Sequence, residues 1–481
     1  MKTNTSNKLV KFLNQDYDTL KAQCLSKKAL FSDPTFPAAP ESLGFNLLGP
    51  NSDMAKEVVW KRPKDIIQNP KFIVGGATKA DINQGALGDC WLMAAIASLT
   101  LDPDILARVI HPEQNFEENY AGIFHFQLWQ YGQWVDVVID DLLPTRNGKL
   151  LFVHSLDKNE FWSALLEKAY AKVNGSYEAL KGGSATEGFE DFTGGIAELY
   201  ELNKAPSNLF NIMKKALSRG SLLSTSISVK DVTKEQLVKT HAYSITAAEE
   251  LVRLRNPWGH KEWNGAWSDN SKEWDYVLPQ EKAKLNYSAD DGEFWMAYSD
   301  FVERYSKVEI CNLTPDLSSS DHVGQWALQQ FEGNWKNGST AGGSSKNTAT
   351  FSSNPQFVMN LDHESHGGMH TCSVLVGLMQ KDMRKERKLG HNFNNICFAV
   401  YPHKGGKLSH EVLSTAKAAF TSEHYARREV SQRFALPPGQ YIIIPSTYEP
   451  NHEGSFLTQV PLVGVSAPTM YITAAKYLTT Q

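Results

Sequence analysis

One stretch near residue 84 constrains the fold of this chain more than any other part of the sequence. Residues 84–91 read Gln-Gly-Ala-Leu-Gly-Asp-Cys-Trp, and they run directly into the apolar, helix-forming segment Leu92–Leu99. The pattern predicts a glycine-containing turn followed by a helix that begins at Cys90. A thiol at a helix start faces unpaired backbone N–H groups and the positive end of the helix dipole. Both favour the thiolate, the form that attacks carbonyl carbons.

The residues before Cys90 fit a catalytic turn. Gly85 and Gly88 lack a Cβ atom, so the turn can adopt unusual dihedral angles and a substrate backbone can approach closely. Gln84 carries a side-chain amide that can donate to a developing oxyanion beside the backbone N–H of Cys90. A free cysteine is more often buried than catalytic, so the partners of Cys90 decide between the two interpretations.

A catalytic cysteine needs a base and a third group that orients the base, and in papain-like proteases these lie about 150 residues away in sequence. His241 stands at such a distance, at the start of an alternating run that predicts a strand. A second predicted strand, Leu251–Arg255, leads into Asn256. A tight turn at Glu249–Glu250 would bring the strands together, so that the Asn256 amide could hold the His241 ring. The joint pattern favours a cysteine protease site.

The sequence resembles the calpain family of calcium-activated intracellular cysteine proteases. The resemblance runs from about residue 31 to about residue 456, and its blocks are residues 84–99, 120–127, 159–174, 187–195, 241–245, 255–259 and 291–296. It implies that Cys90 is the nucleophile, His241 the base, Asn256 the group that orients the base and Gln84 the oxyanion donor. The implied reaction is limited cleavage of internal peptide bonds in protein substrates, through a thioester on Cys90.

The resemblance also implies Ca2+ as a cofactor at two sites. Carbonyl oxygens of the loop 74–81 and a carboxylate are ligands that calcium prefers, although from spacing alone such a loop is more often an ordinary turn. Calpains place one calcium ion on the positions that match Val74 and Gly76 (backbone), Asp81 and Glu160. A second set of positions is Glu262, Asp269, Ala289, Asp291 and Glu293. EF-hand spacing is missing here, so the resemblance alone makes these residues calcium ligands.

We expect an α+β chain, with a two-lobed papain-like cysteine protease core followed by an all-β C2-like sandwich. Helical spacing predicts an N-terminal helix over 7–28, and alternating runs around Tyr131-Gly132 predict a hairpin over 122–141, with Asp140-Asp141 as solvated carboxylates at its end. Runs at 371–379, 395–401 and 440–445 predict sandwich strands. The expected domains are an anchor-like helix (1–30), a Cys lobe (31–195), a His/Asn lobe (196–317), the C2-like domain (318–470) and a tail (471–481). The resemblance implies that Trp258 lies as a wedge between the lobes when calcium is absent.

Composition bears on the compartment and the partners. The five cysteines lack CxxC spacing and no signal peptide is recognisable, which indicates reduced thiols and a cytoplasmic location. A net charge of −5 gives no sign of a nucleic-acid partner. The basic run 381–388 could meet an anionic membrane surface, although a solvated hairpin tip is the simpler interpretation. No penta-EF-hand domain follows the sandwich, so we expect no small subunit to dock.

Two other functions use similar residues. One is a catalytically silent calpain-like scaffold that binds membranes or protein partners through the C2-like domain, and the intact Cys90, His241 and Asn256 argue against it. The other is transglutaminase-like acyl transfer, where an Asp usually fills the third role, so that Asn256 favours the protease. Cleavage of casein by the pure chain, with and without calcium, would distinguish these functions.

Overall fold

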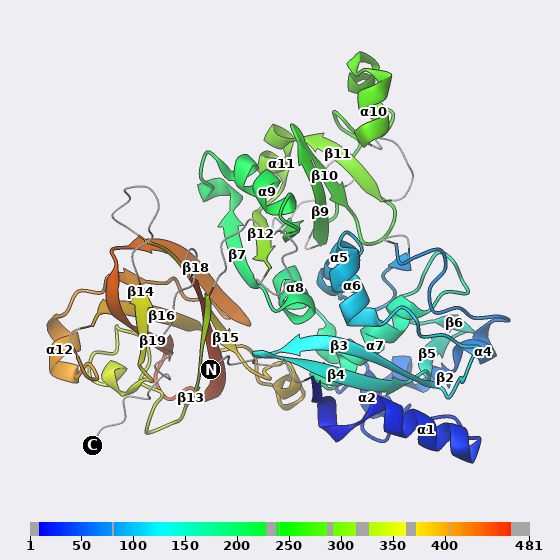
Figure 1. Ribbon diagram of the computed structural model, residues 1–481, viewed down its shortest axis with the longest axis horizontal. Helices are drawn as coiled ribbons and strands as arrows, with labels where there is room; N and C mark the ends of the chain where they lie inside the picture. Colours follow the sequence, from blue (N-terminus) through cyan, green and yellow to red (C-terminus); the bar gives the residue numbers. More distant parts are fainter. Residues whose placement is uncertain are drawn as a thin grey trace, which may run out of the picture. The chain divides into compact units, whose positions relative to one another are not determined.

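The computed structural model describes residues 9–78, 81–227, 237–239, 241–285, 292–313, 327–361, 372–403 and 405–462. The chain divides into two compact units, residues 1–313 and 314–481 (Figure 1). In the described residues the first unit combines helices with three sheets, and the second consists mainly of strands. The expectation of an α+β fold is confirmed.

The first half of unit one is built on helices α5 (Cys90–Leu99) and α7 (Trp162–Asn174) and on the hairpin of β3 (Ile123–Gln130) and β4 (Gln133–Asp140). Tyr131 and Gly132 close this hairpin with φ values of 48° and 100°, a tight turn that matches strand twist, and the hairpin prediction is confirmed. Its other elements are α2 (Pro40–Leu43), α3 (Asp53–Lys56), β2 (Val59–Lys61), α4 (Pro63–Ile66), α6 (Pro103–Ile110), β5 (Leu143–Arg146), β6 (Lys149–Leu150), η3 (Glu178–Leu180) and α8 (Ala185–Thr193).

The second half of unit one is an antiparallel six-stranded sheet in the order β11-β10-β9-β8-β12-β7. Strands β9 (Ala242–Glu249) and β10 (Leu251–Arg255) are joined at Glu250, whose φ is 66°. The predicted tight turn is therefore present. The other elements of this half are β7 (Ile196–Glu201), η4 (Leu202–Lys204), α9 (Leu209–Leu217), β8 (Leu222–Ser226), η5 (Lys272–Tyr276), α10 (Pro279–Leu285), β11 (Glu293–Ala297), α11 (Tyr298–Arg304) and β12 (Lys307–Asn312).

Helix α5 is the element that joins the two halves. Figure 1 shows it between the six-stranded sheet and the β3–β4 hairpin. Every residue from Trp91 to Leu99 is buried, and the Ser244 hydroxyl of β9 donates to the Ala94 carbonyl at 2.8 Å. Only Cys90, at the start of the helix, is partly exposed. The packing of α5 thus sets Cys90 at the junction of the halves.

The N-terminal segment differs from the prediction of one helix over 7–28. Helix α1 covers only Tyr17–Lys27, and Asp16 caps it by accepting from the Thr19 N–H at 2.8 Å. Val10–Lys11 instead form β1, which pairs in parallel with β4, and Phe12–Asn14 form the short 3-10 segment η1. Pairing with a strand far along the chain outweighs local helical spacing here.

The prediction that Asp140 and Asp141 are solvated is wrong. Both are buried, with exposed fractions of 1% and 0%. Asp140 forms an ion pair with Lys168, and Asp141 forms one with Arg62. Buried carboxylates require such partners because water no longer solvates them. These charges lock the hairpin to α7 and to the segment before α4.

The second unit contains two four-stranded sheets, in the orders β13-β20-β15-β18 and β14-β19-β16-β17. Inward-facing residues such as Trp335, Val374, Phe398 and Ile443 form a shared apolar core, as expected for a sandwich. The predicted strands are confirmed. The elements are β13 (Ala327–Trp335), η6 (Phe351–Ser353), β14 (Phe357–Leu361), β15 (Cys372–Gln380), η7 (Lys385–Leu389), β16 (Ile396–Pro402), α12 (His410–Thr415), β17 (Phe420–Thr421), β18 (Glu429–Leu436), β19 (Gly439–Thr447) and β20 (Gly454–Leu462).

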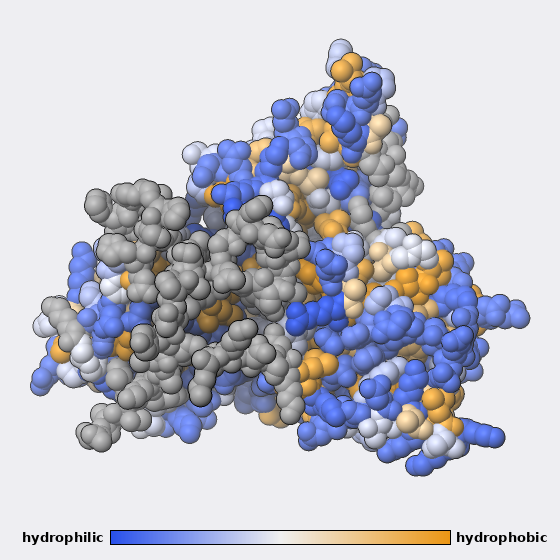
Figure 2. Space-filling view, viewed as in Figure 1, coloured by the Kyte–Doolittle hydropathy of each residue, from blue (hydrophilic) through white to orange (hydrophobic). Residues whose placement is uncertain are grey.

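Where Figure 2 colours the surface by hydropathy, hydrophobic residues lie in patches between hydrophilic ones. Among the described helices, none is by itself long and apolar enough to span a membrane. Helices α5 and α6 reach the required length and composition only when taken together, and they meet at an angle of 116°.

Candidate active site

Cys90 occupies the first position of α5, directly after Asp89. Burial raises the pKa of its thiol, an interaction with the backbone of Ala242 opposes this, and the Asp89 carboxylate raises the pKa further. Desolvation therefore outweighs the helix start in this arrangement. The expectation that a position at the helix start favours the thiolate of Cys90 does not hold in this arrangement.

The turn before Cys90 depends on one of its two glycines. A Cβ atom at Gly85 would lie 2.2 Å from the carbonyl oxygen of Phe152, closer than any side chain allows. The next residue anchors the turn, because the Ala86 N–H donates to the Leu151 carbonyl at 3.0 Å. At Gly88 a Cβ would meet only the side chain of Lys181, at 3.6 Å. The close approach thus explains Gly85 and leaves Gly88 without a steric requirement.

His241 and Asn256 lie side by side at the ends of β9 and β10. His241 Nε2 and Asn256 Oδ1 are 2.7 Å apart, and both residues are buried. The Asn256 amide nitrogen donates to the carbonyls of His260 and Lys261 at 2.8 and 3.0 Å, which fixes Oδ1 toward the imidazole. The ring proton is then on Nε2, and Nδ1 is the basic nitrogen. Burial lowers the pKa of His241 to about 4, and the bond to Asn256 acts in the opposite direction.

Trp258 connects the two halves at this point. Its Nε1 donates to Gln84 Oε1 at 2.6 Å, and its ring centroid lies 4.5 Å from that of His241. The Gln84 amide nitrogen donates to the Leu87 carbonyl at 2.7 Å and to Asp89 Oδ1 at 3.3 Å. Both ends of the Gln84 amide are therefore engaged by the protein itself, and Trp258 covers the imidazole.

Sequence reasoning missed a buried carboxyl pair beneath the nucleophile. The buried carboxyls of Asp89 and Glu167 interact with each other, and Glu167 also accepts from the Val153 N–H at 3.1 Å. Burial raises the pKa of Asp89 to about 6. Burial and the Asp89 charge raise the pKa of Glu167 well above its usual value. The available signal was a glutamate within the otherwise apolar face of α7.

Part of the first proposed calcium set comes together in the structure. The carboxyls of Asp81 and Glu160 interact with each other, and Glu160 Oε1 accepts from the Val74 N–H at 2.7 Å. Burial, followed by the Asp81 carboxyl, raises the pKa of Glu160 to about 8. Asp81 also accepts from Trp162 Nε1 at 3.2 Å. Gly76, with φ 97°, stands in open space in the same loop.

The second set is described only in part, because Ala289 and Asp291 lie outside the described residues. Glu262 and Asp269 line an open pocket of about 500 Å³ together with Trp263 and Ser268. Glu262 Oε1 accepts from the Gly292 N–H at 2.8 Å, which ties this pocket to the residue before Glu293. Glu293 is buried, and Arg253 Nε lies 3.7 Å from its Oε1.

Comparison with known proteins shows the family of this chain. A family model described as calpain family cysteine protease matches residues 31–312, and one described as calpain large subunit, domain III, matches residues 331–460. The calpain-2 catalytic subunit of Mus musculus is 53% identical over 477 residues, which cover 94% of this chain and 68% of that protein. Calpain-8 of Mus musculus is 53% identical over 479 residues, and the calpain-1 catalytic subunit of Gallus gallus is 52% identical over 480, with the same coverage. The chain belongs to the calpain family: it is a calcium-dependent cysteine protease that acts on protein substrates.

Proposed function

We propose that Cys90, His241, Asn256 and Gln84 carry out the hydrolysis. One observation carries this assignment: the Cys90 thiol interacts with the backbone of Ala242, which lowers the thiol pKa, and Ala242 directly follows His241 in the chain. His241 is in turn held by Asn256 at 2.7 Å. A thiol, an imidazole and an orienting amide in contact through neighbouring residues are the set that a cysteine protease requires.

The roles follow from the chemistry of these groups. His241 takes the thiol proton, and the sulfur of Cys90 attacks the carbonyl carbon of the scissile peptide bond. His241 then gives that proton to the leaving amine as the C–N bond breaks, which leaves a thioester on Cys90. A water molecule that loses a proton to His241 attacks the thioester, and the proton returns to the departing sulfur. Gln84 and the backbone N–H of Cys90 donate to the carbonyl oxygen while it is negatively charged.

The described arrangement supports a resting state. A thiol with a raised pKa and an imidazole with a pKa of about 4 form a neutral pair. The Gln84 amide donates within its own loop and accepts from Trp258, so it is not available to an oxyanion. Activation therefore requires Trp258 to leave His241 and Gln84 to turn.

Calcium binding supplies this rearrangement in our proposal. The Asp81–Glu160 pair fits a cation, because two carboxyls in contact must share a proton unless a positive charge takes its place. Asp81 and Glu160 would hold the ion with the carbonyls of Val74 and Gly76. Glu262, Asp269 and Glu293 would hold a second ion, with Ala289 and Asp291. Bound calcium neutralises the carboxylates and orders their loops, with no part in bond breaking.

We also propose the domain limits 31–195, 196–317 and 318–470, with an N-terminal helix within 1–30 and a tail at 471–481. The first limit is supported by α8, which ends at Thr193 with Gly194 as its C-cap, before β7 starts at Ile196. The division into compact units after residue 313 supports the second. Limited proteolysis with mass spectrometry tests both, and early cuts inside β7 or β12 would contradict them.

Contact of the C2-like domain with an anionic membrane surface is proposed for residues 381–388. Lys388 and the neighbouring Leu389 are exposed in η7, which supports contact with a surface. Ion pairs of Lys381 with Glu332 and of Lys385 with Asp382 reduce the charge of this run. Co-sedimentation with phosphatidylserine vesicles should weaken in Lys388→Glu, and unchanged binding would contradict the proposal.

Casein cleavage by the full chain, with and without calcium, tests the catalytic assignment. Cys90→Ala should abolish cleavage and leave folding intact, because it removes the nucleophile and little packing. Asn256→Ala should slow the reaction less, since Asn256 orients the base and forms no bond with substrate. Calcium-dependent cleavage by Cys90→Ala above background would refute the assignment.

A further inference from the structure

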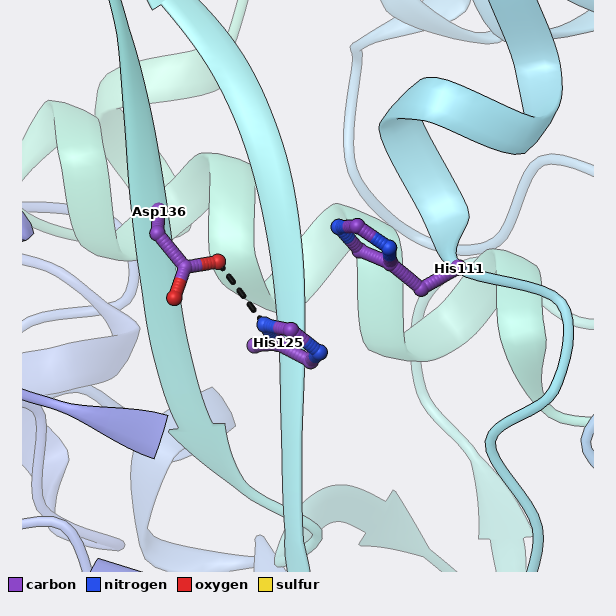
Figure 3. A group of neighbouring side chains, drawn as sticks. All are labelled: His111, His125 and Asp136. Atoms are coloured by element: carbon purple, nitrogen blue, oxygen red, sulfur yellow. Dashed lines mark hydrogen bonds and ion pairs between the residues drawn. The ribbon is translucent and has the colours of Figure 1, made fainter. Parts of the chain in front are cut away.

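A second group of metal-ligating side chains lies away from the active site, in the first half of unit one. His111 follows α6, His125 belongs to β3 and Asp136 belongs to β4. Figure 3 shows the three side chains gathered on one side of the hairpin. One ligand atom of each residue lies within 4.8 Å of those of the other two. Nothing in the proposed proteolysis uses these residues.

His125 is held in place by its neighbours. Its Nδ1 lies 2.8 Å from Asp136 Oδ1 (Figure 3). Tyr17 of α1 stacks on the His125 ring, with 3.8 Å between the ring centroids. The His111 ring also stacks on His125, with 4.5 Å between centroids and ring planes 3° from parallel. The contact with Asp136 places a carboxylate oxygen directly beside an imidazole nitrogen, so two atoms of the kinds that bind a transition metal already lie together. The hairpin thus presents a fixed ring beside His111.

His111 is placed there by the end of α6. It caps the helix in the left-handed conformation, with φ 46° and ψ 79°, which costs energy for a residue with a side chain. Its Nε2 is buried without a hydrogen-bond partner among the described residues. Burial and the neighbouring His125 lower the pKa of His111. A buried nitrogen without a partner is unfavourable unless a ligand satisfies it.

We propose that His111, His125 and Asp136 bind a divalent transition-metal ion of the zinc class. Two imidazoles and one carboxylate are ligands that zinc accepts, whereas calcium requires oxygen ligands. Water completes the coordination. The ion takes the place of the proton between His125 and Asp136.

Binding requires a small movement of the side chains. Bonds of about 2.0–2.1 Å to a tetrahedral ion set neighbouring ligand atoms about 3.4 Å apart, whereas the three atoms here are separated by up to 4.8 Å. The parallel rings also direct their in-plane lone pairs along parallel lines. One imidazole must therefore turn out of the stack. His111 is the freer of the two, because its nearest carboxylate oxygen, Oε1 of Glu113, is 3.9 Å from Nδ1, whereas Asp136 holds His125 at 2.8 Å. The three ligand residues are thus already neighbours, and the side chains move closer together when the ion binds.

Zinc titration of the full chain by calorimetry tests this site. The parent should be the Cys90→Ala chain, because the catalytic thiol is itself a zinc ligand, and excess calcium should be present to fill the oxygen sites. We expect one zinc equivalent that is lost, or bound at least tenfold more weakly, in His111→Asn. Asparagine tolerates the left-handed conformation, so this variant removes the imidazole with little backbone strain.

Two further variants keep the test decisive. Asp136→Asn should weaken zinc binding as well, and if it does not fold, His111→Asn alone decides. His410→Asn, which changes an exposed histidine of the second unit, should leave the titration unchanged. Cobalt in place of zinc should give a visible absorption band that His111→Asn abolishes. Equal zinc stoichiometry and affinity in parent and His111→Asn would overturn the proposal and leave the stacked rings as packing only.

Discussion

Replacing Trp258 with Phe should make the protease easier to activate by calcium. Trp258 Nε1 donates to Gln84 Oε1 at 2.6 Å in a partly buried position, and a phenyl ring keeps most of the contact area without the donor. We propose that this bond belongs to the resting state alone. Its loss then destabilises that state by about 0.5–1.5 kcal/mol, the usual net value of a hydrogen bond. The equilibrium moves toward the active arrangement by about 2- to 13-fold.

In our proposal two calcium ions bind for each activation event. The calcium midpoint should therefore fall by the square root of the shift in the equilibrium, which is about 1.5- to 3.5-fold. The assay is a calcium titration of peptide cleavage. Trp335→Phe is the matched control, because Trp335 Nε1 donates to the Pro445 carbonyl at 3.1 Å in the second unit. Trp335→Phe removes a buried hydrogen bond of an indole N–H and leaves the bond to Gln84 unchanged. An unchanged or raised midpoint in Trp258→Phe would refute the argument.

Three further predictions concern the calcium switch. Glu160→Ala or Glu293→Ala should raise the calcium midpoint while activity at saturating calcium falls less, and a hyperbolic titration insensitive to both changes would contradict coupled sites. A chain that ends at residue 316 contains all proposed catalytic and calcium-binding residues, so it should fold and cleave casein with calcium; loss of calcium activation in the folded fragment would move the switch to the second unit. Because the pKa of Glu160 is about 8, protons compete with calcium below that pH. The calcium midpoint should therefore rise as pH falls from about 8.5 to about 6.5, and Glu160→Ala should show a smaller rise.

Features that depend on neighbouring residues could be predicted from the sequence. The helix that starts at Cys90 follows from an apolar run after a glycine-containing turn, and the hairpin at Tyr131-Gly132 follows from alternation around a turn dipeptide. The contact of His241 with Asn256 required only that two adjacent strands pair across Glu250. In each case the deciding interaction spans few residues, so local pattern and final structure agree.

Features that depend on distant partners could not be predicted. Residues 10–11 pair with β4 instead of extending α1, and Asp140 is buried because Lys168 of α7 faces it. The Asp89–Glu167 pair likewise needs α7 to pack beneath the catalytic turn. Burial also reverses the expected thiolate preference of Cys90. Desolvation and pairing are properties of the assembled fold, and no sequence window contains both partners.

The energetics of the site explain why the two halves must rearrange before reaction. Proton transfer from Cys90 to His241 has to overcome the difference between their pKa values. Burial lowers the pKa of His241 to about 4 and raises the pKa of the Cys90 thiol. Both changes oppose the transfer, so the neutral pair is favoured while the two groups stay in this arrangement.

This difference in pKa closes when thiolate and imidazolium form side by side, because each charge then stabilises the other. The Trp258 ring, 4.5 Å from His241 between centroids, occupies a face of the imidazole and also holds Gln84. One movement of Trp258 therefore frees the base and the oxyanion donor together. Each half carries one proposed calcium set. We propose that both sets are coupled to this movement, so that ion binding supplies the free energy that the neutral pair lacks.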